Sequence, residues 1–297
     1  MNDRLAMGWI PDYPDFRDYT EDSEKIREIL EPTGVLLRAP RGEKKGPAAL
    51  PPSVDLRDWC SPIEDQGQLG SCTANAGAGV IEYYERKSFG RHIEASRLFL
   101  YKVTRNLMKM TGDTGAYLRT TIGAMVIFGV PPEEYWPYTD DPKGFDSEPP
   151  AFCYSFAQNY KTLMYYRHDP ASAGPEAVIG RLKTYLAAGH PAMFGFSVYS
   201  SIEQAGETGN IPFPSPRDRM EGGHAVVAVG YDDKKEIRNE HADRPETGAL
   251  LIRNSWGKEW GEAGYGWLPY EYVKRGLAED FWSVLKKEWV DTGEFRV

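Results

Sequence analysis

Cysteine and histidine are the residue types best suited to nucleophilic chemistry in this chain of 297 residues, and one cysteine has a distinctive setting. Cys72 ends the glycine-rich stretch Gln66-Gly67-Gln68-Leu69-Gly70-Ser71-Cys72 and begins a run of small residues that predicts a helix. The unpaired N–H groups at a helix N-terminus favour negative charge, so a thiol placed there ionises more easily. A lone cysteine is by default a small buried apolar residue, but this setting predicts a nucleophile.

A thiol nucleophile needs a base, which can be a histidine far away in the sequence. His224 follows a diglycine and begins an apolar run that predicts a strand, 225–230. Asn254 follows another apolar run, 249–253. Taken alone, such a histidine is more often structural and such an asparagine caps or turns the chain. The remaining histidines lie in polar or turn contexts, and we expect them to be surface or ordinary structural residues: His92, His168, His190 and His241.

Four segments, in the same order, resemble the papain-like cysteine proteases. Their motifs are L-P-x-x-V-D-L/W-R, matched at 50–57, Q-G-x-C-G-S-C-W at 66–73, H-A-V-x-x-V-G-Y at 224–231, and N-S-W-G-x-x-W-G-x-x-G-Y at 254–265. The resemblance covers about residues 50 to 270. It implies an α+β papain-like fold of two lobes with the active-site cleft between them. A helical lobe would span about 60–160 and a strand-rich, barrel-like lobe about 161–297, together forming a peptidase domain of residues 50–297.

The resemblance also implies a role for each catalytic position. Cys72 would attack as a thiolate, and His224 would act as base and then as acid to the leaving amine. Asn254 would orient the histidine ring, and Trp256 would shield that hydrogen bond from water. The Gln66 side chain and the backbone N–H of Cys72 would form the oxyanion hole. The implied activity is hydrolysis of peptide bonds through an acyl-enzyme.

Substrate contacts are implied by the same resemblance. Gly115 occupies the position at which the family pairs its backbone with an extended substrate. The candidates for the neighbouring side-chain pocket are Ala116, Tyr117, Gly195, Gly223 and Ala225. The alternative interpretation is that these small residues only satisfy turns.

The expected elements divide the chain into a helical first half and a strand-rich second half, which favours two lobes of different class. Helices are predicted at 72–87, 95–108, 116–128 and 176–188, and 149–160 is expected to be irregular. Strands are predicted at 192–199, 225–230, 249–253 and 264–268.

Residues 1–49 differ in composition from the rest. An aromatic, proline- and aspartate-rich stretch spans 9–16, a short helix is predicted near 23–30, and the basic stretch 38–47 is typical of a linker. Our hypothesis is a short prosegment, as in a zymogen, whose 9–16 stretch lies in or beside the cleft and restrains activity. The alternative is an ordered extension that packs elsewhere.

The composition of the chain limits the classes of molecule that it is expected to bind. A net charge of −9 argues against nucleic acid and anionic membranes, so we expect peptide or protein substrates. No apolar run is long enough for a membrane span, and the first residues lack the apolar core of a secretory signal, which favours a cytoplasmic protein. The cysteines and histidines lack the spacing of metal ligands, so neither a metal nor a cofactor is expected.

Two departures from the family motifs fit an intracellular, prokaryote-like branch. Leu69 replaces a cysteine, so the usual disulfide there cannot form, and Thr73 replaces an aromatic residue. Cys60 and Cys153 are expected to be free thiols, which suits a reducing compartment. Two alternative functions are a non-catalytic binding protein that keeps the papain-like fold, and a transglutaminase-like acyl transferase that uses the same kind of triad.

Overall fold

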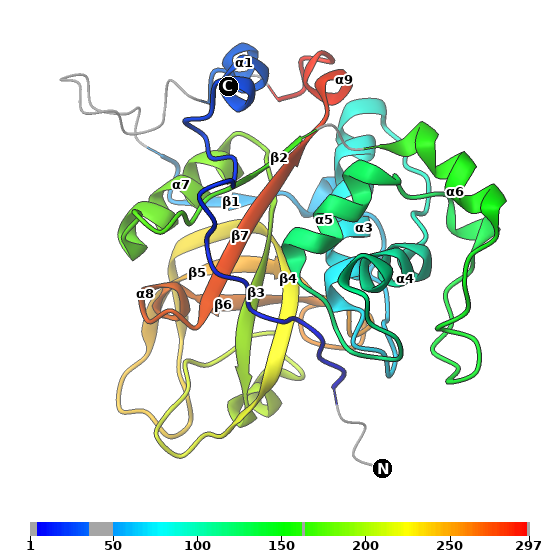
Figure 1. The fold of residues 1–297 in the computed structure, drawn as a ribbon. Helices are drawn as coiled ribbons and strands as arrows, with labels where there is room; N and C mark the ends of the chain where they lie inside the picture. Colours follow the sequence, from blue (N-terminus) through cyan, green and yellow to red (C-terminus); the bar gives the residue numbers. More distant parts are fainter. Residues whose placement is uncertain (1–4, 36–49, 162–163, 296–297) are drawn as a thin grey trace.

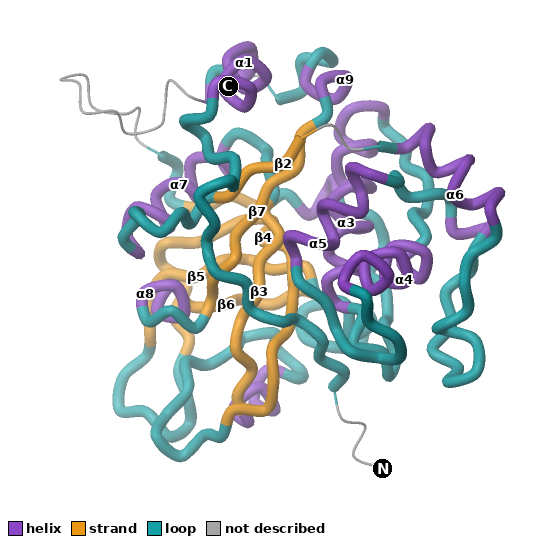
Figure 2. Tube along the Cα trace, in the orientation of Figure 1, coloured by secondary structure: helices purple, strands orange, loops and turns teal. Residues whose placement is uncertain are grey.

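The computed structural model describes residues 5–35, 50–161 and 164–295. Helices α3 (Cys72–Phe89), α4 (Arg97–Met108), α5 (Leu118–Ile127) and α6 (Ala151–Ala157) gather on one side, and a seven-stranded sheet lies on the other (Figure 1). Figure 2 shows the same division, with the helices in purple and the strands of the sheet in orange. The fold is therefore α+β, as predicted. Within the described residues, no helix combines the length and apolar character needed to cross a bilayer.

The sheet is antiparallel throughout, in the order β2-β7-β3-β4-β5-β6, and β1 pairs with β4. The strands are β1 (Ser53–Asp55), β2 (Met164–Arg167), β3 (Ala192–Tyr199), β4 (Met220–Ile237), β5 (Glu246–Arg253), β6 (Tyr265–Pro269) and β7 (Ala278–Leu285). Helices α7 (Pro175–Ala187), α8 (Tyr270–Lys274) and α9 (Lys287–Val290) accompany the sheet. The long strand β4 pairs with three neighbours, so a residue on it is held from both sides.

Helix α3 is the central helix, and its small residues explain its position. A Cβ on Gly77 would lie 3.0 Å from Leu100 Cδ2 of α4, and one on Gly79 would lie 2.9 Å from Arg253 Nη1 of β5. The glycines therefore let α3 approach both the neighbouring helix and the sheet. The helix ends at Gly90, whose left-handed conformation (φ 70°) directs its N–H to the carbonyl of Arg86.

Segment 149–160 is the place where the expected secondary structure is wrong. It forms α6 and a 3-10 turn, Gln158–Tyr160. Pro150 precedes the helix at a position that tolerates proline, since the first N–H groups of a helix need no intrahelical acceptor. Phe156 then packs edge-on against Tyr135 with ring centroids 5.0 Å apart, and such tertiary contacts outweigh the local signal.

The N-terminal extension crosses the front of the molecule and leads into α1 (Glu24–Leu30), close to the predicted helix (Figure 1). Ile26 and Leu30 are buried in a small apolar cluster with Tyr166, Tyr185 and Leu285 of the body. The extension is therefore packed on the body rather than separate from it. The predicted linker at 38–47 lies outside the described residues.

Candidate active site

Cys72 is the first residue of α3 and is completely buried. The preceding turn is fixed to the body at several points. The Gln66 N–H donates to the carbonyl of Ser255 (2.9 Å), and the Gly70 N–H donates to Asp113 Oδ1 (2.9 Å). Gly67 has a positive φ of 57°, which only glycine adopts without strain. The turn therefore holds the sulfur at the helix N-terminus.

His224 lies on β4 and is also completely buried. Its Nε2 lies 2.7 Å from Asn254 Oδ1, a carbonyl oxygen that can only accept a hydrogen bond. The same oxygen accepts from the Ser255 N–H (2.8 Å), which fixes the orientation of the amide. Nε2 therefore carries the proton, and Nδ1 is left as an acceptor. Among the described residues, Nδ1 has no hydrogen-bond partner.

Trp256 covers this pair. Its ring stacks on the imidazole with centroids 4.2 Å apart and planes 20° apart. It is itself almost fully buried. The tryptophan therefore covers one face of the imidazole beside its hydrogen bond to Asn254.

The sulfur of Cys72 lies beside the segment that carries the histidine. The backbone N–H of Ala225, the residue next to His224, is close enough to the thiol to lower its pKa. The N–H of Gly8, in the extension, acts on the thiol in the same way. Three segments that are distant in sequence thus meet at one sulfur atom.

Burial determines the protonation states of this pair. It raises the pKa of Cys72 to about 11, against the opposing effect of the N–H groups of Ala225 and Gly8. It lowers the pKa of His224 to about 4, although the bond to Asn254 favours the charged ring. The covered site therefore favours a neutral thiol and a neutral imidazole. This differs from the thiolate that the helix N-terminus was expected to favour, because burial outweighs the effect of the N–H groups on the pKa of Cys72.

Gln66 is buried at the edge of the site, with both ends of its amide engaged. Its Oε1 accepts from Ser255 Oγ (2.6 Å), and its Nε2 donates to the carbonyl of Leu69 (2.8 Å). Nε2 also donates to the carbonyl of Ala6 in the extension (3.2 Å). The amide N–H group proposed for an oxyanion is therefore occupied by a carbonyl oxygen of the chain itself.

The extension binds through its backbone as an extended segment. The Trp9 N–H donates to the carbonyl of Gly223 (3.0 Å). The Ala116 N–H donates to the carbonyl of Gly8 (2.8 Å), and the Ala116 carbonyl accepts from the Ile10 N–H (3.1 Å). These bonds make a parallel bridge between Trp9 and Ala116. Two of the residues predicted to bind substrate, Ala116 and Gly223, thus bind the extension.

The other predicted substrate residues lie around the same segment. A Cβ on Gly115 (φ 72°) would come within 2.3 Å of the Gly8 carbonyl oxygen, and one on Gly195 within 1.9 Å of Trp9 Cε2. Ala225 lies opposite Gly195 in the pairing of β3 with β4. Tyr117 is half-buried immediately before α5. Glycine is therefore needed at 115 and 195 because the extension approaches so closely.

Asp280 is a residue that the sequence analysis missed. Its carboxylate accepts from the indole N–H of Trp9 (3.2 Å), 271 positions away in the chain. No motif marks it, since an aspartate in a strand is ordinary by itself.

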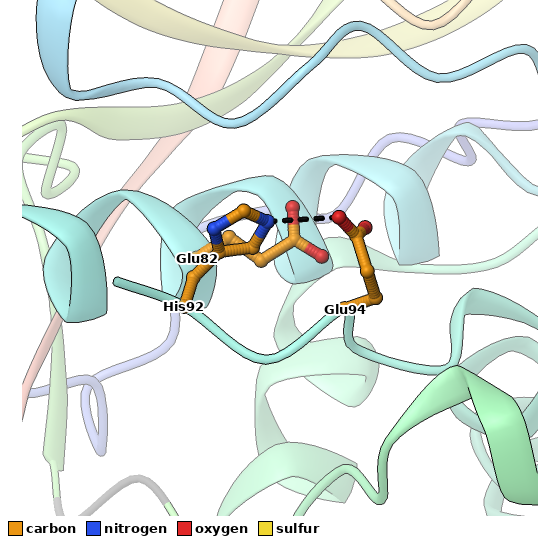
Figure 3. Close-up of side chains that lie close together, drawn as sticks. All are labelled: Glu82, His92 and Glu94. Atoms are coloured by element: carbon orange, nitrogen blue, oxygen red, sulfur yellow. Dashed lines mark hydrogen bonds and ion pairs between the residues drawn. The ribbon is translucent and has the colours of Figure 1, made fainter.

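A possible metal site lies away from the cleft, where Glu82, His92 and Glu94 come together (Figure 3). Both oxygens of Glu82 are already engaged, by Ser61 Oγ and by the Ala95 N–H. His92 Nε2 is paired with Glu94 Oε1 at 2.9 Å. These hydrogen bonds and this ion pair within the chain hold the three side chains together.

The remaining cysteines and histidines lie outside the site. Cys60 and Cys153 are buried free thiols, as expected. His168 and His190 are also completely buried, and burial lowers the pKa of each to about 3. His168 bonds to Ser283 Oγ and His190 to the Tyr84 hydroxyl, so both are structural residues of the interior.

Comparisons with known proteins agree with this geometry. A family model described as papain family cysteine protease matches residues 50–283. An uncharacterised peptidase C1-like protein of Acanthamoeba polyphaga mimivirus is 36% identical over 226 residues, which are 74% of this chain and 68% of that protein. Mouse cathepsin K is 26% identical over 225 residues, 74% of this chain and 60% of its own length. The crystal structure of xylellain, a cysteine protease from Xylella fastidiosa, matches with a TM-score of 0.71 and 37% identity, covering 94% of this chain and 96% of that chain.

Proposed function

Because this chain belongs to the papain family of cysteine proteases, we propose that Cys72, His224 and Asn254 are the residues with which it hydrolyses peptide bonds. One observation carries the assignment of roles. The Nε2 of His224 is held by Asn254 at 2.7 Å, while Nδ1 lacks a partner in the described part of the chain. The N–H of the next residue, Ala225, acts on the Cys72 thiol and opposes the rise in its pKa, so the thiol lies beside the segment that carries His224. Nδ1 is therefore the ring nitrogen that is left to accept the thiol proton.

In the acylation step, His224 Nδ1 takes the proton of Cys72, and the sulfur attacks the carbonyl carbon of the substrate. The carbonyl oxygen becomes an oxyanion that accepts from Gln66 Nε2 and from the Cys72 N–H. One such donor is commonly worth about 10²–10³-fold in rate. The intermediate then collapses, the C–N bond breaks, and His224 gives its proton to the leaving amine.

In the deacylation step, water attacks the thioester carbon and gives a proton to His224. The C–S bond breaks, the carboxylic acid leaves, and the proton returns to the sulfur. Asn254 keeps the ring in one orientation through both steps, so the same nitrogen serves as base and as acid.

We further propose that the N-terminal extension restrains this activity by occupying the cleft. Ala6 accepts the hydrogen bond of Gln66 Nε2 that an oxyanion would need. The N–H of Gly8 acts on the thiol of Cys72 and lowers its pKa. The extension therefore covers both the donor for the oxyanion and the thiol. The neutral thiol of the covered site supports the same proposal, since a thiol is a far weaker nucleophile than a thiolate.

The nucleophile is tested with the full chain carrying Gly8→Ala, which clears the cleft. A Cβ at this position would lie 1.8 Å from the carbonyl oxygen of Gly70, a residue held to the body through the bond of its N–H to Asp113, so we expect the extension to move. In this background, Cys72→Ala is expected to abolish hydrolysis of a fluorogenic peptide. Cys153→Ala, a change of another buried free thiol, is the matched control and is expected to keep the activity.

Equal hydrolysis by the Cys72→Ala and Cys153→Ala chains would refute Cys72 as nucleophile. Product analysis with an added amine separates hydrolysis from acyl transfer. A carboxylic acid as main product supports the proposal, and an amide of the added amine would support the transferase alternative.

A further inference from the structure

The hydroxyl of Tyr138 contacts both ends of the turn 66–71, which precedes the nucleophile. It donates to the carbonyl of Gln66, the first residue of the turn, at 2.8 Å. It also lies 2.7 Å from the hydroxyl of Ser71, the last residue of the turn. Gln66 carries one of the two donors proposed for the oxyanion, and Ser71 is bonded directly to Cys72, whose N–H is the other. One hydroxyl group thus joins the two residues that place these donors.

The hydrogen bonds around this hydroxyl have one consistent direction. A carbonyl oxygen can only accept, so the proton of Tyr138 points to Gln66. The Tyr138 oxygen then accepts from the Ser71 hydroxyl. The Ser71 oxygen accepts in turn from Asn75 Nδ2 at 3.1 Å. A chain of hydrogen bonds therefore runs from Asn75 through Ser71 and Tyr138 to Gln66, and we call it the Tyr138 chain.

Most of the Tyr138 chain is shielded from water. Gln66, Ser71 and Asn75 are each at most 1% exposed, and Tyr138 is half-buried. Burial raises the pKa of Tyr138 to about 12, so the hydroxyl keeps its proton at neutral pH. Loss of one member would leave a buried partner unpaired, and such a loss costs more than the net value of an exposed hydrogen bond.

The same residues fix the direction of the Cys72 N–H. Asn75 Nδ2 also donates to the carbonyl of Ser71 (3.0 Å), which belongs to the same planar peptide group as that N–H. Arg97 supports the arrangement from α4. Its Nη1 donates to Asn75 Oδ1 (3.3 Å), and its Cζ lies 4.1 Å from the centroid of the Tyr138 ring.

Gln66 is held from two sides. Ser255, which follows β5, accepts from the backbone N–H of Gln66 and donates through Oγ to its Oε1. Tyr138, which follows the helices α4 and α5, binds the Gln66 carbonyl from the other side. These partners belong to the body and not to the extension, so the bonds do not depend on the covered state.

We propose that Tyr138 is a positioning residue of the peptidase reaction, whose hydroxyl sets the separation of the two oxyanion donors. This inference rests on the roles proposed for Gln66 and Cys72. An oxyanion hole stabilises the transition state only when its donors already lie within about 2.7–3.1 Å of the developing oxyanion. Without the hydroxyl, the turn is held at one end only, and the two donors no longer meet the same oxygen.

The test uses the full chain with Gly8→Ala and a fluorogenic peptide. Tyr138→Phe removes only the hydroxyl. We expect kcat to fall about 10- to 100-fold with little change in KM, because the donors are displaced rather than removed and act in the transition state. Tyr154→Phe is the matched control, since its hydroxyl donates to Glu148, outside the turn, and it should keep both constants.

A double-mutant cycle with Gln66→Ala separates positioning from a general loss of stability. If Tyr138 acts through Gln66, the fall in kcat caused by Tyr138→Phe should be at least about threefold smaller in the Gln66→Ala chain. Ser71→Ala interrupts the Tyr138 chain at its next member. The same non-additivity is expected of it, and it replaces Tyr138→Phe in the cycle if that variant does not fold in thermal melting.

Alkylation of Cys72 by iodoacetamide provides a second measurement. The sulfur displaces iodide and no oxyanion forms, so Tyr138→Phe should leave the rate unchanged while kcat falls. A parallel fall of both would show that the hydroxyl supports the thiol and its base in general, and would overturn the inference.

An unchanged kcat in Tyr138→Phe would also overturn the inference, as would losses that simply multiply in the cycle with Gln66→Ala. In these cases the Gly8→Ala chain still hydrolyses the peptide, so the proposed function stands while the inference falls. If that chain hydrolyses no peptide, the proposed function fails and the inference fails with it.

Discussion

Trp9→Ala is the substitution expected to release the extension from the cleft most directly. In the covered state, with the extension in the cleft, only 5% of Trp9 is exposed to solvent, and its indole N–H donates to Asp280. In the open state the same side chain faces water. The substitution therefore raises the free energy of the covered state and leaves that of the open state almost unchanged.

The expected size follows from this difference. Truncation of a buried tryptophan to alanine commonly costs about 3–5 kcal/mol. At 1.36 kcal/mol per factor of ten, the ratio of covered to open molecules falls about 10²- to 5 × 10³-fold. Activity should rise by the same factor, until nearly all molecules are open and the rate reaches its limit. Helix α1 keeps its own apolar contacts, so the chain should stay folded.

The assay is the initial rate of hydrolysis of a fluorogenic peptide by the full-length variant and the unaltered chain. Phe16→Ala is the control, since Phe16 belongs to the same extension but is 96% exposed. It should leave the rate unchanged. If Trp9→Ala and Phe16→Ala give the same rate as the unaltered chain, while thermal melting shows all three folded, the restraint does not exist and the reasoning is refuted.

Three further predictions concern the site. Gln66→Ala in the Trp9→Ala chain should lower kcat about 10²–10³-fold with little change in KM, because it removes a donor to the oxyanion; an effect on KM alone would contradict this role. Asn254→Ala should lower kcat roughly 5- to 150-fold, the equivalent of one buried hydrogen bond of about 1–3 kcal/mol, and an unchanged kcat would show that the 2.7 Å bond does not orient His224. Burial holds the pKa of Cys72 at about 11 in the covered chain, so its alkylation by iodoacetamide should be slow at neutral pH and rise steadily as the pH approaches that value. In the Trp9→Ala chain, where the thiol is exposed and its pKa falls, alkylation should already be fast at neutral pH; identical pH profiles would contradict the link between burial and protonation.

The segments that build the site could be predicted from the sequence because each has a local signal. A glycine-rich turn before small residues marks the start of α3, and a diglycine before an apolar run marks the position of His224 on β4. The convergence of these segments depends on the whole fold. That convergence could be predicted only because four motifs, in the same order, resemble those of the papain-like cysteine proteases.

Other features had no local signal. Asp280, which accepts from the indole N–H of Trp9, lies where the pairing of β3 with β7 shifts register, and a register shift cannot be predicted from the residues of one strand. The raised pKa of Cys72 follows from its complete burial, which depends on the whole fold. The proline pair before α6 indicated irregular chain, although tertiary aromatic contacts make it a helix start.

The account depends above all on Cys72 as a thiol activated by His224. Labelling with an epoxide inhibitor, followed by peptide mapping, tests this directly in the Trp9→Ala chain with and without His224→Ala. The account predicts rapid labelling at Cys72 alone, and strongly slowed labelling once the histidine is removed. Labelling at Cys60 or Cys153 instead, or a rate at Cys72 that does not depend on His224, would contradict it.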